Sequence, residues 1–251
     1  MTNNLNKKKI LLGITGSIAA YKAPLLVREF VKSGADVTVL MTQSAKEFVS
    51  PLTLANLSRN DVIINMFDES SQTSGAWHIE LAHSCDIMLI APCSATTLGK
   101  LANAICDSPL ISVATALPPE IPLIVSPAMD STMWLHPATQ RSVKLIQSDG
   151  ALILPPVDGD LSSGFVGPGR FPDIEDVVNF TSYALEYFRN RTRYTVVDDV
   201  YKKGQNISDT DDDTAELINK PLETLQDAIE KDKWNAEMDL EKMKKRNDEK
   251  A

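Results

Sequence analysis

Residues 77–107 read WHIELAHSCDIMLIAPCSATTLGKLANAICD, and this stretch decides the fold. Its apolar middle, 87–91, has the length and composition of a buried strand. Small and hydroxyl-bearing residues follow at 92–97, and apolar periodicity through Ile105 then predicts a helix. In an open parallel sheet, ligands bind beyond the carboxyl ends of the strands, where a helix N-terminus offers unpaired N–H groups. The order strand, hydroxyl cluster and helix therefore predicts a site for an oxygen-rich ligand.

Strand-like and helix-like segments alternate on both sides of this stretch. Further strands are expected at 9–16, 36–42, 61–65, 122–129 and, as the last of them, 151–155. Helices are expected at 17–32, 45–49, 51–58, from His78, from Ser94, and at 109–117, 136–148 and 174–188. Such alternation implies right-handed βαβ units. The predicted fold class is α/β, with a single doubly wound, Rossmann-like parallel sheet of the flavodoxin-like kind.

Glycine and proline mark the irregular points of this pattern. Pro24 lies about two turns into the helix expected at 17–32 and predicts a kink, and Gly34 is expected to end that helix. Residues 158–171 are rich in Gly, Ser and Asp and show no periodicity. They are therefore expected to form a loop or a mobile flap.

Composition and charge exclude several classes of protein. Hydrophobic residues make up 43% of the 251 residues, which is enough for a sizeable core, and the formal net charge is −9. A negative charge disfavours nucleic acid as a partner, and no apolar run approaches the roughly 20 residues that span a membrane. The N-terminus shows no signal-peptide pattern. Three cysteines without zinc or disulfide spacing fit a reducing cytoplasm, and no histidine grouping predicts a metal site.

The composition changes near residue 190, which predicts two parts. Residues 1–190 hold the alternating pattern and are expected to form one folded domain. Residues 191–251 contain 12 Lys and Arg, 16 Asp and Glu and a DTDDD run at 209–213, so a charged, disordered C-terminal tail is expected. The alternative is an amphipathic, partner-binding helix over 222–245.

Hydroxyl side chains follow three of the expected strands. Ser17 closes the sequence GITGS at 13–17, which lacks the third glycine of the dinucleotide fingerprint. Thr42 and Ser44 follow the second strand, and 94–97 follow the strand at 87–91. Three such strand ends favour one shared ligand that carries a phosphate. Plain strand–helix turns and helix caps are the alternative, and Cys93 is expected to be a small buried residue.

Four ordered segments resemble one family. They are TGSIAAYK (15–22), HIELAHSCDIMLIAPCSATTLGKLANAICD (78–107), SPAMDSTMW (126–134) and GFVGPGR (164–170). Together they resemble the homo-oligomeric flavin-containing cysteine decarboxylases, over about residues 8–188. The resemblance implies an FMN cofactor, a homotrimer or dodecamer, and oxidative decarboxylation of a cysteine unit.

The family has branches with different substrates. Its coenzyme A branch converts 4′-phosphopantothenoylcysteine to 4′-phosphopantetheine, and the resemblance is strongest to this branch. Another branch decarboxylates the C-terminal cysteine of a peptide during lantibiotic maturation. A third group comprises non-catalytic relatives that regulate protein phosphatases.

The resemblance also implies roles for particular residues. His78 matches the active-site histidine, and Ser163 lies on the flap as the second expected catalytic residue. Asp130 and Met133 are expected to contact the substrate. The residues expected to contact the flavin are Gly16, Ser17, Ile18, Thr42, Ser44, Ser94, Ala95, Thr96, Thr97, Ala128 and Met129.

Three positions depart from the family pattern. Thr96 replaces an asparagine of the Ser-Ala-Asn-Thr motif, Asp130 replaces a substrate-clamping asparagine, and Ser163 replaces a cysteine that is thought to supply a proton. Two like charges about 4 Å apart repel by about 4 kcal/mol at an effective dielectric of 20, so an ionised Asp130 beside a substrate carboxylate is costly. Asp130 is therefore expected either to be protonated or to accept a hydrogen bond from a substrate amide N–H.

Overall fold

The sheet of this protein is parallel and doubly wound, as predicted. A computed structural model describes residues 5–67 and 75–190, so the predicted tail at 191–251 and most of the polar loop at 68–76 lie outside the described residues. Six strands pair in the order β3-β2-β1-β4-β5-β6. They are β1 (Lys9–Ile14), β2 (Asp36–Met41), β3 (Val62–Ile63), β4 (Ile87–Cys93), β5 (Leu123–Pro127) and β6 (Leu152–Ile153). The strand order reverses between β1 and β4, and ligands bind at such a switch point.

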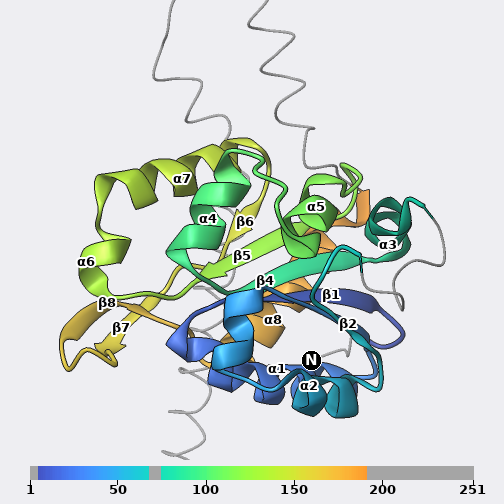
Figure 1. Cartoon of the computed structure of the whole chain (residues 1–251), viewed down its shortest axis with the longest axis horizontal. Coiled ribbons are helices and arrows are strands. Elements are labelled where there is room, and N and C mark those ends of the chain that lie inside the picture. The colour runs from blue at the N-terminus through green and yellow to red at the C-terminus, as the bar shows by residue number, and fades with distance from the viewer. Residues whose placement is uncertain (1–4, 68–74, 191–251) are drawn as a thin grey trace, which may run out of the picture. The chain divides into compact units, whose positions relative to one another are not determined.

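Helices cover both faces of the sheet (Figure 1). One layer contains α1 (Ala23–Lys32), α2 (Pro51–Ser58) and α8 (Ile174–Tyr187). The other contains α3 (Trp77–Ser84), α4 (Ala95–Ala102), α5 (Pro109–Thr115) and α7 (Pro137–Ser148). Within residues 5–67 and 75–190, none of these helices combines the length and the apolar character that a membrane span requires.

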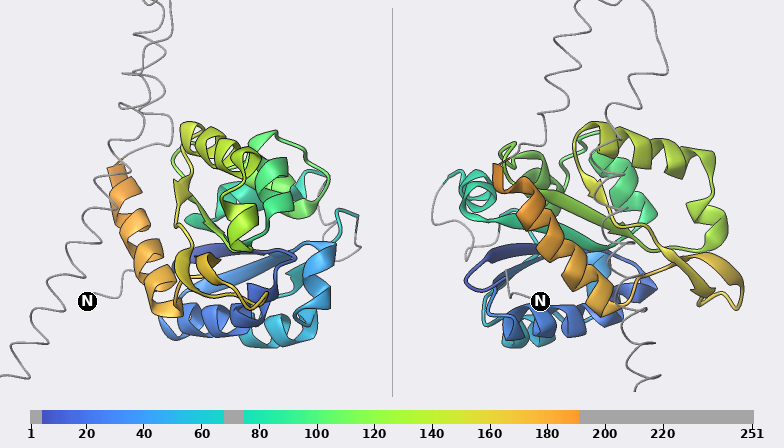
Figure 2. Two further views of the ribbon diagram at one scale, coloured as in Figure 1. Left: turned by 90° about the vertical axis from the view of Figure 1, so that its left-hand side faces the viewer. Right: turned by 180° about the vertical axis from the view of Figure 1, so that it is seen from behind.

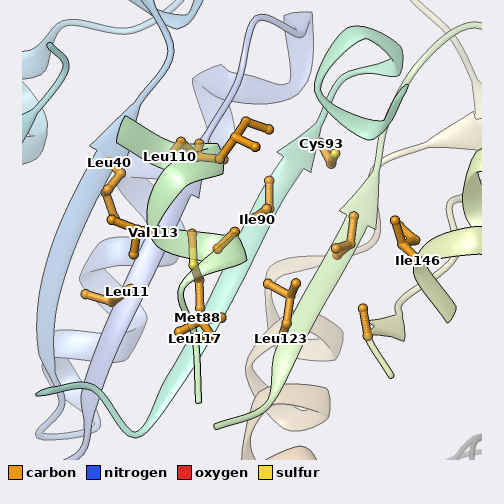
Figure 3. Packing of buried hydrophobic residues seen from close by; sticks show 14 of the residues in the cluster. Leu11, Leu40, Met88, Ile90, Cys93, Leu110, Val113, Leu117, Leu123 and Ile146 are labelled. Carbon is orange, nitrogen blue, oxygen red and sulfur yellow. The ribbon is translucent and has the colours of Figure 1, made fainter. Parts of the chain in front are cut away.

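The core is built on β4, whose seven residues are all buried. Met88 and Ile90 point to the layer that holds α5, where they pack among Leu110, Val113 and neighbouring apolar side chains (Figure 3). Each fully buried side chain of this size stabilises the fold by about 1.5–3 kcal/mol. A strand that lies between two other strands and between two helical layers has no solvated side, which explains its continuous apolar run.

Two of the helices expected near the N-terminal strands form differently. A 3₁₀ turn, η1 (Ile18–Lys22), precedes α1, and Pro24 lies in the first turn of α1 instead of kinking a longer helix. Proline suits that place because its missing N–H has no partner there in any case. The segment after β2 is likewise a 3₁₀ turn, η2 (Gln43–Glu47), and the helix after Ser94 ends at Ala102 rather than reaching Ile105.

The expectation of a structureless segment at 158–171 is wrong. β7 (Val157–Asp160) and β8 (Val166–Arg170) form an antiparallel hairpin, so β6 is not the last strand. Gly169 has a φ of 141°, and a Cβ added there would lie 2.2 Å from the carbonyl oxygen of Met129. Glycine thus lets β8 press its backbone against the loop after β5, where the Met129 N–H donates to the Gly169 carbonyl at 3.1 Å. A short helix that was not predicted, α6 (Ser131–Trp134), follows this loop.

Candidate functional site

A cleft of about 630 Å³ opens beyond the carboxyl ends of β1, β4 and β5. This volume lies in the usual range of small-molecule sites, about 300–1,000 Å³. The predicted site residues that line it are Gly16, Ser17, Ile18, Ser94, Ala95, Ala128, Met129, Asp130 and Met133. The hairpin closes one side of the cleft through Asp160, Leu161, Ser162, Gly169 and Arg170. The structure therefore brings together two of the three strand ends that the sequence marked with hydroxyl side chains, those of β1 and β4, and adds the end of β5.

Buried polar contacts hold these strand ends together. The Thr15 hydroxyl, which is fully buried, donates to the Pro92 carbonyl at 2.8 Å and accepts from the Ser94 N–H at 2.7 Å. The Ser17 hydroxyl donates to the Ala128 carbonyl at 3.0 Å. A buried hydroxyl without partners would be costly, so these bonds tie the ends of β1, β4 and β5 into one rigid rim.

The hydroxyl cluster at 94–97 divides into two roles. Ser94 caps α4: its oxygen accepts from the Thr97 N–H at 3.3 Å, and its hydroxyl lies 3.2 Å from the Thr97 hydroxyl oxygen. Thr97 is only 4% exposed, so it supports Ser94 instead of lining the cleft. Thr96 is exposed and also lies outside the lining. Ser94 and Ala95 remain at the cleft, beside the N-terminus of α4.

Gly16 makes room for a second hydroxyl group at the first strand end. A Cβ added to Gly16 would lie 2.5 Å from the Ser44 hydroxyl oxygen, which real Cβ atoms essentially never do. Ser44 in turn lies 3.3 Å from the Thr42 hydroxyl, oxygen to oxygen. Thr42 and Ser44 are thus behind Gly16 rather than among the lining residues. Together with Ser17, this arrangement fits an anion such as a phosphate.

We expect Gly16→Ala to weaken flavin binding by about 5- to 150-fold, because overpacking of this kind costs about 1–3 kcal/mol. The added methyl group must displace the Ser44 side chain. Titration of apoprotein with FMN, followed by flavin fluorescence, measures the effect. Gly99→Ala is the matched control, because Gly99 lies on α4 with no atom within 4 Å of an added Cβ. We call the anion site at Gly16 and Ser17, backed by Ser44, the cradle. Equal affinities of the two variants for FMN would contradict it.

The cleft also has a cationic corner, formed by two residues that sequence reasoning missed as ligand contacts. Lys22 and Arg170 both line the cleft. Burial lowers the pKa of Lys22, and the neighbouring Arg170 lowers it further, while Asp173 raises it. The Lys22 ammonium donates to the Phe171 carbonyl at 3.5 Å. Both cations belong to the quoted segments TGSIAAYK and GFVGPGR, so the signal was present but was not assigned to a ligand.

His78 lies apart from the cleft. It is half-buried on α3, where its ring makes an edge contact with Trp77 at 5.9 Å between centroids. Figure 1 places α3 and the β7–β8 hairpin at opposite sides of the molecule, and Figure 2 shows the same separation from behind. No group of three or more His, Cys, Asp or Glu could hold a metal ion in the described part of the chain. Within one copy, the structure does not bring His78 to the other predicted site residues.

Asp130 and Ser163 meet at the outer edge of the cleft. The Ser163 hydroxyl donates to Asp130 Oδ2 at 2.6 Å. Asp130 also caps α6, because its Oδ1 accepts from the Thr132 N–H at 3.0 Å. These bonds, with that of Ser163 first, lower the pKa of Asp130. The lowered pKa favours the carboxylate over the protonated acid, and the acceptance of a substrate N–H by Asp130 stays a prediction.

A doubly wound sheet with a hydroxyl-lined cleft at its switch point is the architecture of a protein that binds a nucleotide-like cofactor. The family model described as Flavoprotein matches residues 1–186, and the chain belongs to this family. Its site accordingly binds a flavin.

Curated relatives are similar over the same region. A probable phosphopantothenoylcysteine decarboxylase of Streptococcus mutans is 43% identical over 171 residues, which cover 68% of this chain and 95% of the relative. A coenzyme A biosynthesis bifunctional protein of Bacillus subtilis is 39% identical over 188 residues, or 75% of this chain. The chain spans less than half of that bifunctional protein, 45% of its length.

Solved structures show the same likeness. A cysteine-to-serine mutant of PPC decarboxylase complexed with pantothenoylaminoethenethiol has a TM-score of 0.63 and 32% identity, covering 70% of this chain and 97% of that one. An FMN-dependent cysteine decarboxylase from thioviridamide biosynthesis has a TM-score of 0.54 and 28% identity, covering 59% and 90%. The family match and these structures confirm the resemblance and the fold that the sequence indicated.

Proposed function

We propose that this protein is an FMN-dependent decarboxylase that converts 4′-phosphopantothenoylcysteine to 4′-phosphopantetheine in coenzyme A biosynthesis. The observation that carries the proposal is the cleft at the switch point, which is lined by both hydroxyl-bearing and cationic residues. The 43% identity to a probable phosphopantothenoylcysteine decarboxylase, over 95% of that relative's length, supports the proposed substrate of this protein. The three free cysteines of the described chain fit the cytoplasm as its setting.

The residues of the cleft fit the phosphate and the ring of FMN, the flavin named for a similar solved decarboxylase. Gly16 and Ser17 line the cleft and offer backbone and one hydroxyl group to its phosphate, with Ser44 directly behind Gly16. The N-terminus of α4 adds a positive dipole end. Ile18, Ala95, Ala128 and Met129 offer apolar surface for the ring. A flavin bound here supplies hydride chemistry, and the protein orients the groups that react.

Other lining residues of the cleft suit an acidic substrate with an amide. Lys22 and Arg170 provide positive charge for a phosphate or carboxylate. Asp130 provides an acceptor for an N–H donor, and Met133, which is 49% exposed, adds apolar contact. An N-acylated cysteine that carries a phosphate combines these features. Each residue thus binds or orients one chemical group of the proposed substrate.

We further propose that the active site is completed in a homo-oligomer, as a homotrimer or dodecamer. His78 lies on α3, which is on the opposite side of the molecule from the β7–β8 hairpin, and it is not among the residues that line the cleft (Figures 1 and 2). Large apolar side chains remain exposed around the cleft, including Tyr21 at 61% and Ile18 at 56%. Exposed apolar surface of this kind marks interaction sites. A second copy that covers this rim could bring its own His78 to the cleft.

The decisive test is to incubate purified, FMN-loaded protein with 4′-phosphopantothenoylcysteine and to follow carbon dioxide and product mass. We expect substrate-dependent carbon dioxide release and a product lighter than the substrate by the mass of carbon dioxide, or by carbon dioxide and two hydrogens if the oxidised product is released. A peptide with a C-terminal cysteine, tested in parallel, is the control for the second candidate substrate. Retained flavin with no release from either substrate would reject the enzymatic proposal.

A second candidate function is decarboxylation of a peptidyl cysteine. The observation that favours it is Ser163, which leaves the flap without a thiol. The structural likeness to the decarboxylase from thioviridamide biosynthesis is compatible with this candidate. A non-catalytic, regulatory role is a third candidate, which detectable decarboxylation of either substrate would exclude.

A further inference from the structure

The tip of the β7–β8 hairpin, residues 161–165, is fastened to the loop after β5 by side chains 33 residues apart in sequence. We call this segment the flap tip. The Ser163 hydroxyl donates to Asp130 Oδ2 at 2.6 Å, while the Thr132 hydroxyl and N–H donate to Oδ1 at 2.7 and 3.0 Å. All three bonds direct a hydrogen at the carboxylate. A carboxylate with three donors is stabilised as the anion.

The base of the hairpin is held by a different kind of contact. A Cβ at Gly169 would lie 2.2 Å from the Met129 carbonyl oxygen, and one at Gly167 would lie 2.7 Å from the Ser131 hydroxyl oxygen. Backbone packing therefore anchors β8 beside Asp130, whichever residue occupies position 163. The hydrogen bond from Ser163 holds the other end of the hairpin, the exposed flap tip. Its neighbours Leu161 and Ser162 line the cleft.

We propose that Asp130 positions Ser163, and that the two form a clasp that holds the flap tip over the cleft. In this clasp the Ser163 hydrogen stays directed at Asp130, so Ser163 supplies no proton to the product. Asp130 Oδ2 keeps a lone pair that can accept from a substrate N–H. The consequence for the product rests on the proposed function, whereas the clasp itself does not.

The charge of Asp130 is what distinguishes a clasp from a simple surface contact. Hydrogen bonds to an ionised acceptor are roughly twice as strong as neutral ones. An asparagine side chain at this position would keep the helix cap, since Asn caps helices as well as Asp does, but would offer a neutral acceptor. The change Asp130→Asn therefore weakens the clasp without removing the cap of α6.

A double-mutant cycle tests the coupling in the FMN-loaded protein. Chymotrypsin cleavage after Phe165, which is 70% exposed, is followed by fragment mass. We expect Ser163→Ala to speed this cleavage by about fivefold with Asp130 present and by about twofold or less in the Asp130→Asn background, because coupled residues are not additive. Ser162→Ala is the control for the flap tip and should change little. Equal effects of Ser163→Ala in both backgrounds would overturn the clasp.

A thiol at position 163 reports the charge directly. In Ser163→Cys, ionised Asp130 opposes formation of the thiolate, and the Asp130→Asn change should raise iodoacetamide alkylation at neutral pH by about fivefold, as expected for charges about 4 Å apart in water. The mass of the peptide that contains residue 163 separates this thiol from the exposed Cys106. The pair Ser162→Cys, with and without Asp130→Asn, is the control and should respond less. An unchanged alkylation rate would overturn the assignment, and neither readout depends on decarboxylation.

Discussion

His78→Asn is expected to retain FMN and to lose carbon dioxide release by about 10²- to 10⁴-fold, the usual contribution of a general acid or base. The flavin contacts proposed above lie on other elements, and His78 lies on α3, away from the cleft of its own chain. Imidazole moves protons near neutral pH, whereas a carboxamide does not. Flavin absorbance of the purified variant and carbon dioxide release from 4′-phosphopantothenoylcysteine measure the two halves of this prediction.

Subunit complementation tells whether His78 acts in a neighbouring copy. Gly16→Ala lacks a proper cradle but keeps His78, and His78→Asn keeps the cradle. In randomly mixed oligomers made by co-expression, about a quarter of the sites would combine an intact cradle with a neighbour's histidine, if each site uses one neighbour. At an FMN concentration well below the Kd of Gly16→Ala, we therefore expect activity from the mixture and almost none from either variant alone. Wild-type activity of His78→Asn would refute the assignment, and an inactive mixture would place His78 in its own chain's site.

The central strands could be predicted because their environment leaves little choice. The run at 87–93 is buried on both faces, so each residue is apolar or small, and no helical pattern competes with it. The strand ends could be predicted for a related reason. Ser17 and Ser94 cap the turns that follow, and hydroxyl caps are a local signal.

The hairpin could not be predicted because its causes are not local. The segment shows no alternation of apolar and polar side chains, because it contains Gly159, Gly164 and Gly169. Its glycine-rich composition normally indicates a loop. What makes the segment pair is its docking on Met129 and Ser131, a contact that exists only once β5 is in place. The same limit applies to Thr15, whose partners Pro92 and Ser94 are far away in sequence.

The motif match found His78 but carried no information about which copy's cleft it serves. Sequence similarity preserves the order of segments, whereas the place of a side chain depends on packing. Lys22 and Arg170 illustrate the opposite case: both stand inside recognised segments, yet their convergence on one cleft became visible only in three dimensions. The contact between Asp130 and Ser163 likewise joins two positions that sequence reasoning had treated as separate departures.

Oxidative decarboxylation first gives an enethiol, which becomes 4′-phosphopantetheine only when a hydride and a proton are returned to it. The joint change Asp130→Asn with Ser163→Cys is expected to raise the fraction that completes this second step more than any other change at these positions. A cysteine thiol has an unperturbed pKa of about 8.5 and is a far better proton donor than a serine hydroxyl. Ser163→Cys alone should shift the product less, because ionised Asp130 holds the thiol hydrogen and opposes the thiolate. Asp130→Asn alone should leave the ratio near that of the wild type, since serine remains the flap residue.

Product mass reads this ratio directly, because the enethiol is two hydrogens lighter than 4′-phosphopantetheine. The expected order of the phosphopantetheine fraction is wild type and Asp130→Asn lowest, Ser163→Cys higher, and the joint variant highest. Ser163→Ala should match the wild type, because in the clasp the serine hydrogen is directed at Asp130 and not at the product. If the wild type already yields only 4′-phosphopantetheine, another group supplies the proton, and the expected order of the four proteins is wrong. If Ser163→Ala lowers the fraction, Ser163 itself donates, and Asp130 must then hold its hydrogen less firmly than the 2.6 Å contact implies.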